Sequence, residues 1–263
     1  MTLTSDSQLA IPNTVAIIQA RYTSTRLPGK VLLDITGQPM LVRVVERTRR
    51  AKTVRRIVVA TTTEPADDAV EALCQEHGYS FYRGSNFDVL DRYYQVAKAY
   101  NADVIVRITA DCPLIDPQVI DDTVRAFMGK YDFAANRLPP PWHRTYPIGL
   151  DVEVCTFQGL ELAWQEAESP HQREHVMPFF YEQPQRFRIL HLTHDPDYGH
   201  LRWTVDTPQD LELVRRIFAH FDGRNDFSWL DVLALFEQQP DLAEINAKVR
   251  HKSVFDVDER WHK

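Results

Sequence analysis

The chain has 263 residues, a formal net charge of −7, and 44% hydrophobic and 25% charged residues, which is ordinary for a globular protein. The acidic balance argues against a nucleic-acid-binding surface, and no apolar run approaches the ~20 residues that span a bilayer. The three cysteines are far apart and predict neither a disulfide framework nor a zinc site. We therefore expect a cytoplasmic protein with no nucleic-acid or membrane partner, whose residues 1–13 form a flexible tail.

Strand-like and helix-like segments alternate through the first half of the chain. Apolar runs predict buried strands at 15–20, 56–61, 79–83 and 104–109. Amphipathic spacing and capping residues predict helices at 39–50, 65–77 and 88–100, and another that opens at Asp116-Pro117. This alternation is typical of an α/β fold with a mostly parallel, doubly wound sheet.

The regular alternation of strands and helices ends after about residue 130. A proline-rich connection covers 138–142, half-exposed strands are expected at 148–156 and 186–192, and a helix is expected at 157–168. We interpret 133–200 as a mixed α/β insertion, for substrate binding or dimerisation, within a single domain of residues 14–263. The core pattern returns with a strand at 201–205, followed by helices from 206, over 228–238 and over 240–252.

A basic loop follows the first predicted strand directly. It carries Arg21, Arg26 and Lys30, with small hydroxyl residues between them. A loop at the carboxyl end of a parallel strand is where an open α/β sheet presents cations to phosphate, so we predict triphosphate binding. A solvated loop without a ligand is the alternative. The loop is not a Walker A motif, because Val31 follows Lys30 where that motif has Ser or Thr.

Two aspartates lie just past predicted core strands, at the same edge as the basic loop. They are Asp111 and Asp206. A magnesium ion that handles a triphosphate needs only one or two protein carboxylates, so this pair would suffice. Each has a structural alternative: Asp206 precedes Thr207-Pro208 and could cap a helix, and Asp111 could be a turn residue.

The basic loop, Gln19-Ala-Arg-Tyr-Thr-Ser-Thr-Arg-Leu-Pro-Gly-Lys30, resembles the amino-terminal signature of the sugar-acid cytidylyltransferases, the group of the CMP-KDO and CMP-acylneuraminate synthetases. It most resembles the branch named after the spore-coat polysaccharide biosynthesis protein F. Thr23 departs from the pattern, which usually has glycine there. The aspartate elements also match, as Ile108-Thr-Ala-Asp111-Cys-Pro-Leu-Ile-Asp116 and Trp203-Thr-Val-Asp206-Thr-Pro-Gln-Asp-Leu211. The resemblance covers nearly the whole chain.

This resemblance implies a fold of the nucleotide-diphospho-sugar transferase (GT-A-like) type, a homodimer, and magnesium-dependent transfer of CMP from CTP to a small acidic acceptor with release of pyrophosphate. It implies magnesium at Asp111 and Asp206, which join Arg21 and Lys30 as catalytic residues. The expected nucleotide-binding residues are Gln19, Ala20, Arg21, Ser24, Arg26, Lys30, Arg83, Gly84 and Thr109. The expected acceptor-binding residues are Asp151, Glu153, Arg173 and His175, with Arg137, His143 and Arg144 as further candidates.

Two other functions stay open. A glycosyltransferase on the same fold would use a D-x-D pair, and Asp195-Pro-Asp197 in the middle region matches that pattern. A non-catalytic nucleotide-binding protein would keep the fold without turnover. The role of His175 is also open, because it could bind the acceptor, remove a proton from the attacking hydroxyl, or lie on the surface of a helix that begins after Ser169.

Overall fold

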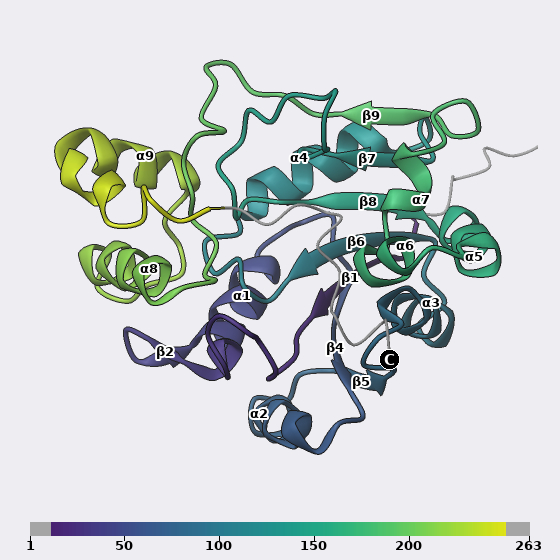
Figure 1. Ribbon diagram of the computed structural model, residues 1–263, viewed down its shortest axis with the longest axis horizontal. Helices are drawn as coiled ribbons and strands as arrows, with labels where there is room; N and C mark the ends of the chain where they lie inside the picture. The colour runs from purple at the N-terminus through teal and green to yellow at the C-terminus, as the bar shows by residue number, and fades with distance from the viewer. Residues whose placement is uncertain (1–11, 251–263) are drawn as a thin grey trace, which may run out of the picture.

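A seven-stranded sheet forms the centre of the molecule in the computed structural model, which describes residues 12–250 (Figure 1). The strand order is β5-β4-β1-β6-β8-β7-β9. The first four strands in that order are parallel: β5 (Phe81–Gly84), β4 (Arg56–Thr62), β1 (Thr14–Gln19) and β6 (Val104–Thr109). The other three are β8 (Glu153–Thr156), which runs antiparallel to both neighbours, β7 (Phe133–Ala135) and β9 (Ile189–His191). The predicted mostly parallel α/β sheet is confirmed.

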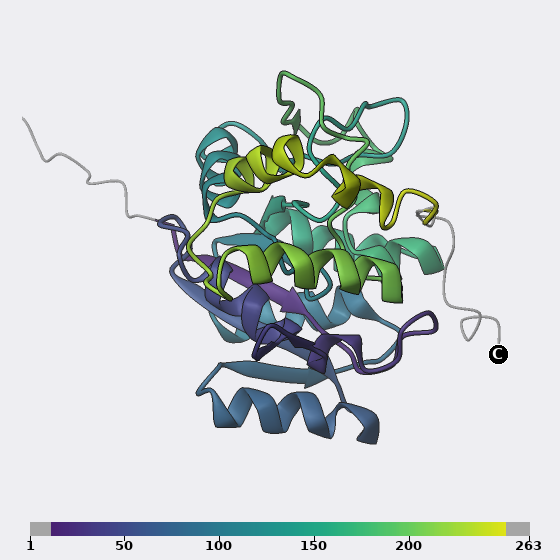
Figure 2. The same cartoon turned by 90° about the vertical axis from the view of Figure 1, so that its left-hand side faces the viewer.

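Helices cover both faces of the sheet, because side chains alternate between the faces along each strand. In β1, Ala16 and Ile18 join one core and Val15 and Ile17 the other. The first core is completed by α1 (Met40–Thr48), α2 (Asp68–Glu76), α4 (Pro117–Phe127), α8 (Pro208–His220) and α9 (Trp229–Gln238). The second is completed by α3 (Val89–Ala99), α5 (Phe157–Glu166) and α7 (Pro178–Tyr181), and α6 (Pro170–His175) lies against α3. Figure 2 shows α8 and α9 lying side by side.

Short elements complete the chain. They are η1 (Lys30–Leu32), β2 (Asp34–Ile35), β3 (Gln38–Pro39), η2 (Pro65–Asp67) and η3 (Pro240–Glu244). The helix predicted at 65–77 is divided into η2 and α2. No helix within residues 12–250 is long and apolar enough to cross a lipid bilayer.

The middle region differs from its prediction. Only Glu153–Thr156 of the strand expected at 148–156 is formed, and it is buried rather than half-exposed, because it lies between β6 and β7 in the sheet. The short strand β7 was not predicted. Region 133–200 thus adds three strands to the same sheet that carries the basic loop.

Two other predictions near the carboxyl end are wrong. Residues 201–205 form no strand; they pair instead with loops, through Trp203 N to Ile148 O (2.6 Å) and Val205 N to Asp111 O (2.8 Å). The last expected helix is limited to η3, and residues 251–252 lie outside the described range. Of the predicted tail, residues 1–11 also lie outside it, whereas the Asn13 side chain donates to Tyr100 O at 2.9 Å.

Gly149 permits the close approach between residues 148–150 and the segment that leads to Asp206. Its φ is +108°, and a Cβ atom there would lie 2.6 Å from Thr204 N and 2.7 Å from the carbonyl carbon of Trp203. Both are backbone atoms, so a side chain could be accommodated only by moving one segment away from the other.

We therefore expect Gly149→Ala to lower the free energy of unfolding by about 2–5 kcal/mol, because backbone strain and a steric clash act together. Gly129→Ala is the matched control: φ there is also positive (+70°), but nothing lies within 4 Å of an added Cβ. Urea unfolding of both variants measures the difference. Equal losses would show that the close approach is not tight.

Candidate active site

The basic loop is fixed to the end of β4 by the side chain of Asp67. Asp67, which is 1% exposed, accepts from Tyr22 N at 2.5 Å and from Thr62 N at 3.1 Å. Gly29 closes the loop by donating its N–H to Tyr22 O at 2.9 Å, and its φ of +69° favours glycine there. Thr23 does not adopt a positive φ. This loop conformation therefore does not require glycine at position 23.

The ammonium group of Lys30 joins the two predicted metal ligands. Its Nζ atom lies 2.9 Å from Asp111 Oδ2 and 2.8 Å from Asp206 Oδ1. Arg26 and Arg202 both contact Asp206 Oδ2, at 2.9 and 2.7 Å. The structure thus brings together three segments that are distant in sequence. The basic loop and the two aspartates lie at the same edge of the sheet, as predicted.

The pKa values of these groups follow from their mutual contacts. Burial opposes ionisation of Asp111, but the charge of Lys30 outweighs it and lowers the pKa of Asp111 to about 2. For Asp206, burial and the charge of Asp111 act to raise the pKa, and Lys30 and Arg26 lower it below the usual value. Burial also opposes the charge on Lys30, yet the two carboxylates raise its pKa. The three groups are therefore all ionised at neutral pH.

Asp206 is not the cap of α8, because Thr207 is. The Thr207 hydroxyl accepts from Asp210 N at 3.3 Å, and the Asp210 carboxylate accepts from Thr207 N at 2.9 Å. Asp210 also accepts from Asp206 N at 3.0 Å. The cap thus holds the backbone at Asp206 and leaves its carboxylate to face Lys30.

The carboxylate pair fits a magnesium ion. Both side chains are partly exposed, 27% for Asp111 and 13% for Asp206, and each has an oxygen within 3 Å of the same cationic atom. Magnesium in triphosphate sites takes one or two carboxylates and fills its other positions with water and phosphate oxygens. Asp111 and Asp206 would be the residues that hold it.

Other predicted nucleotide-binding residues lie at or after the carboxyl ends of the parallel strands. Gln19 and Thr109 end adjacent strands in register, and Ala20 follows with its N–H donated to Ala60 O at 3.0 Å. Ser24 is half-buried in the basic loop. Arg83 ends β5 with Gly84, and its guanidinium binds Glu71 and Asp68 of α2, at 2.6 and 2.7 Å, and Thr62 O at 2.7 Å. Arg83 would have to give up or share these partners to contact a ligand.

A second cluster of polar groups lies on the α6 side of the sheet. Glu153, 2% exposed, binds Arg107 of β6 in a short ion pair and lies 3.8 Å from Nη1 of Arg137. Burial and the charge of Glu153 also raise the pKa of Tyr181, which is 4% exposed. Arg107 and Tyr181 were not among the predicted residues, although an arginine inside the apolar run 104–109 is a signal that could have identified the former.

His175 belongs to this second cluster and is uncharged. Burial, together with the charges of Arg107 and Arg137, lowers its pKa to about 3. Its Nε2 atom is buried and has no hydrogen-bond partner within residues 12–250. α6 ends at His175 because Val176 adopts a φ of 70°, a costly conformation for a β-branched residue. Local strain of this kind is frequent at functional sites.

The remaining predicted acceptor residues are bound to protein partners. Arg173 donates from Nε to Asp88 at 3.1 Å, which fixes α6 to the start of α3. Arg144 donates to Asp151, at 2.5 Å for its shorter contact. His143 contacts Asp197 at 2.7 Å. The expected helix does begin after Ser169, as α6, and the buried Nε2 atom of His175 points away from solvent.

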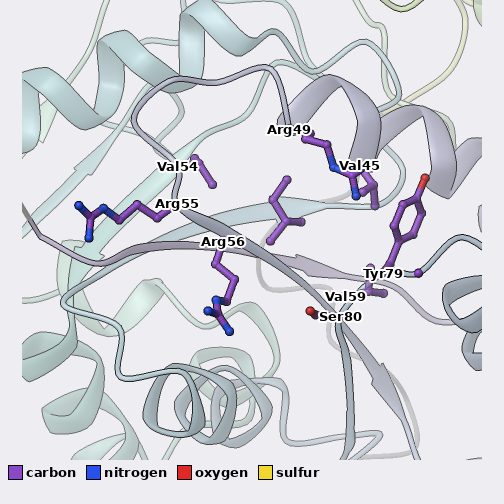
Figure 3. Close-up of a pocket in the computed structure, with 10 residues that line it drawn as sticks. Val45, Arg49, Val54, Arg55, Arg56, Val59, Tyr79 and Ser80 are labelled. Atoms are coloured by element: carbon purple, nitrogen blue, oxygen red, sulfur yellow. The ribbon is translucent and has the colours of Figure 1, made fainter.

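A groove of about 320 Å³ lies at the opposite edge of the sheet, where β4 and β5 begin (Figure 3). Arg49, Arg55 and Arg56 line it, but they point in different directions, and the Arg56 guanidinium lies over the ring of Tyr100 at 5.3 Å. Because the three cations do not converge, this groove offers no focused anion site, and the candidate active site is the carboxylate pair with its cations.

Comparisons with known proteins identify the family of this chain. The family model described as Cytidylyltransferase matches residues 15–246. The spore coat polysaccharide biosynthesis protein SpsF of Bacillus subtilis is 32% identical over 86% of this chain and 95% of its own length. A cytidylyltransferase structure from Leptospira borgpetersenii superposes with a TM-score of 0.84 at 34% identity, over 91% of this chain and 100% of that one.

A more distant structure shares the fold. It is a CMP:2-keto-3-deoxy-manno-octonic acid synthetase complexed with CTP, with a TM-score of 0.60 at 24% identity over 80% of this chain and 99% of that one. The family model spans the basic loop, both aspartate elements and the second cluster. This chain therefore belongs to the cytidylyltransferase family and is a nucleotidyltransferase.

Proposed function

We propose that this enzyme is a magnesium-dependent cytidylyltransferase, which transfers CMP from CTP to a small acidic acceptor and releases pyrophosphate. The observation that carries the proposal is the joint contact of Lys30 with Asp111 and Asp206, beside Arg26. Cations and a carboxylate pair at one sheet edge are what a triphosphate with its metal requires. CTP as the nucleotide is supported by the family match.

We call Arg26, Lys30, Asp111 and Asp206 the first cluster. In this proposal it binds the triphosphate and its metal. Arg21, Arg26 and Lys30 would bind phosphate oxygens and stabilise the charge that develops on them during transfer. Asp111 and Asp206 would hold magnesium, which neutralises charge at the phosphate and helps to orient pyrophosphate. Gln19, Ala20, Ser24, Arg83, Gly84 and Thr109 would complete the nucleotide site. No side chain need form a covalent intermediate, since an acceptor oriented by the site can displace pyrophosphate directly.

The second cluster supports an acidic acceptor. Two guanidinium groups, Arg107 and Arg137, face the single carboxylate of Glu153, and no second carboxylate within residues 12–250 pairs with either of them. Arg137 makes no direct hydrogen bond within the described residues and is 20% exposed. We assign Arg137 to the acid group of the acceptor and His175 to one of its hydroxyl groups. Asp151, held by Arg144, would bind further hydroxyls.

His175 is a poor candidate for the general base. A base acts best when its pKa lies near the working pH, and a pKa of about 3 leaves the imidazole with little affinity for a proton. Its neutral ring offers one donor and one acceptor, which suits binding rather than proton transfer.

The glycosyltransferase alternative receives no support from the Asp195-Pro-Asp197 pair. Asp197 accepts from Gly199 N and from His143, both at 2.7 Å, and is half exposed. A non-catalytic nucleotide-binding protein is distinguished by turnover alone. In either alternative the family fold would be kept, so the decisive measurement is chemical.

We expect CTP with magnesium to raise the melting temperature more than UTP, ATP, GTP or UDP-sugars do, because only a ligand that binds the folded protein stabilises it. Such a ligand at 100 times its Kd adds ~2.7 kcal/mol to the free energy of unfolding. Pyrophosphate release should then appear with a sugar acid, starting with 3-deoxy-manno-octulosonate.

Asp206→Asn should lower kcat at least about 100-fold. Asp226→Asn, which removes an exposed carboxylate paired with Arg224, is the control and should change kcat less than about twofold.

A UDP-sugar that stabilises the protein while CTP is inert would contradict the proposal. Binding of CTP without pyrophosphate release, across a panel of sugar acids, polyol phosphates and phosphonates, would favour the non-catalytic alternative.

His175 also predicts a pH dependence of stability. Because its pKa is about 3 in the folded protein and near 6.5 in the unfolded chain, the unfolded state alone takes up a proton between these values. Stability should therefore fall as the pH decreases from 6.5, by up to about 1.4 kcal/mol per pH unit from this group. His175→Gln should reduce that slope in urea titrations at pH 5–7, and His220→Gln, on exposed α8 surface, should not. Equal slopes in all three proteins would mean that His175 is not held neutral.

A further inference from the structure

Lys30 uses every hydrogen bond that its ammonium group can make. An ammonium has three N–H donors, and those of Lys30 reach Asp111 at 2.9 Å, Asp206 at 2.8 Å and the backbone oxygen of Val205 at 2.9 Å. The residue is only 8% exposed. Lys30 is therefore a saturated internal cation between the two carboxylates.

The charges of this cluster are already balanced. Lys30 and Arg26 face Asp111 and Asp206, and Arg202 is shared between Asp206 and the buried Asp210. A divalent cation that approached alone would meet a neutral cluster and the nearby ammonium charge. It could use both carboxylates fully only if Lys30 withdrew, which would leave a desolvated ammonium without its partners.

A triphosphate changes this balance. Its oxygens are strong acceptors for an ammonium, and the four-carbon stem of lysine lets the group change partners while its backbone stays in place. Phosphate can thus replace the carboxylates as the partner of Lys30, and the divalent cation can then replace Lys30 as the partner of the carboxylates. Each exchange makes the other less costly.

We propose that Lys30 is an internal stand-in for the metal, which holds the carboxylate pair in the nucleotide-free enzyme and admits a divalent cation only when a triphosphate draws it away. The inference rests on the proposed function. It adds that the binding of metal and the binding of triphosphate are coupled. Because such coupling is reciprocal, each ligand strengthens the binding of the other by the same factor.

The test uses Mn²⁺ without nucleotide, followed by electron paramagnetic resonance of the free ion. Lys30→Met removes the ammonium and should tighten Mn²⁺ binding about 5- to 150-fold relative to the wild type, the usual range of such coupling. Lys130→Met is the control, since Lys130 is exposed and precedes β7 at the opposite edge of the sheet. Equal or weaker Mn²⁺ binding by Lys30→Met would overturn the proposal.

A second measurement needs no variant and decides the matter if Lys30→Met does not fold. The ¹H–¹⁵N resonance of Lys30 Nζ in the wild type should stay unchanged in 10 mM Mg²⁺ and should shift when tripolyphosphate or CTP is added. A saturable shift with Mg²⁺ alone, or no shift with either phosphate compound, would overturn the proposal. A shift with tripolyphosphate but not with CTP would support it and contradict CTP as the substrate.

Discussion

The contact of one ammonium group with two carboxylates depends on most of the rest of this structure. Lys30 lies 81 residues before Asp111 and 176 before Asp206, and all three side chains are partly or largely removed from water. Charges in such a place are costly unless their partners are held at hydrogen-bonding distance. The surrounding fold must therefore fix three separate backbone segments with respect to one another.

Each of these three segments is fixed by different contacts. The basic loop is held by Asp67 and by its own closure at Gly29. Asp111 follows β6, which pairs with β1 along its whole length. The segment that leads to Asp206 has no strand to extend; Val205 N and the Thr204 hydroxyl both donate to Asp111 O instead. One carbonyl thereby ties the two metal-binding candidates together.

The sequence was most informative where local patterns decide the outcome. The β-α alternation, the capping of α4 by Asp116 and the end of α2 near residue 77 depend on a few neighbouring residues, and all are present. The pairing of 148–150 with 201–203 depends on contacts between distant loops. An alternating pattern cannot distinguish such a segment from a strand, so the predicted 201–205 strand was wrong. The partners of Arg173 and the second cluster were likewise beyond local patterns.

The two clusters are built in different ways, and this bears on specificity. The first cluster is held by the side chains of Asp67 and Asp210, which bind backbone N–H groups, and by backbone pairs such as Val205 N with Asp111 O. The second depends on side chains from β6, β8 and α6, above all Arg107, Glu153 and His175, of which the first two are paired on adjacent strands. If the second cluster binds the acceptor, as proposed above, changes among these residues would alter the charge and shape offered to it, while the carboxylate pair is held by other contacts. A fold arranged in this way can keep one nucleotide chemistry while its acceptor changes.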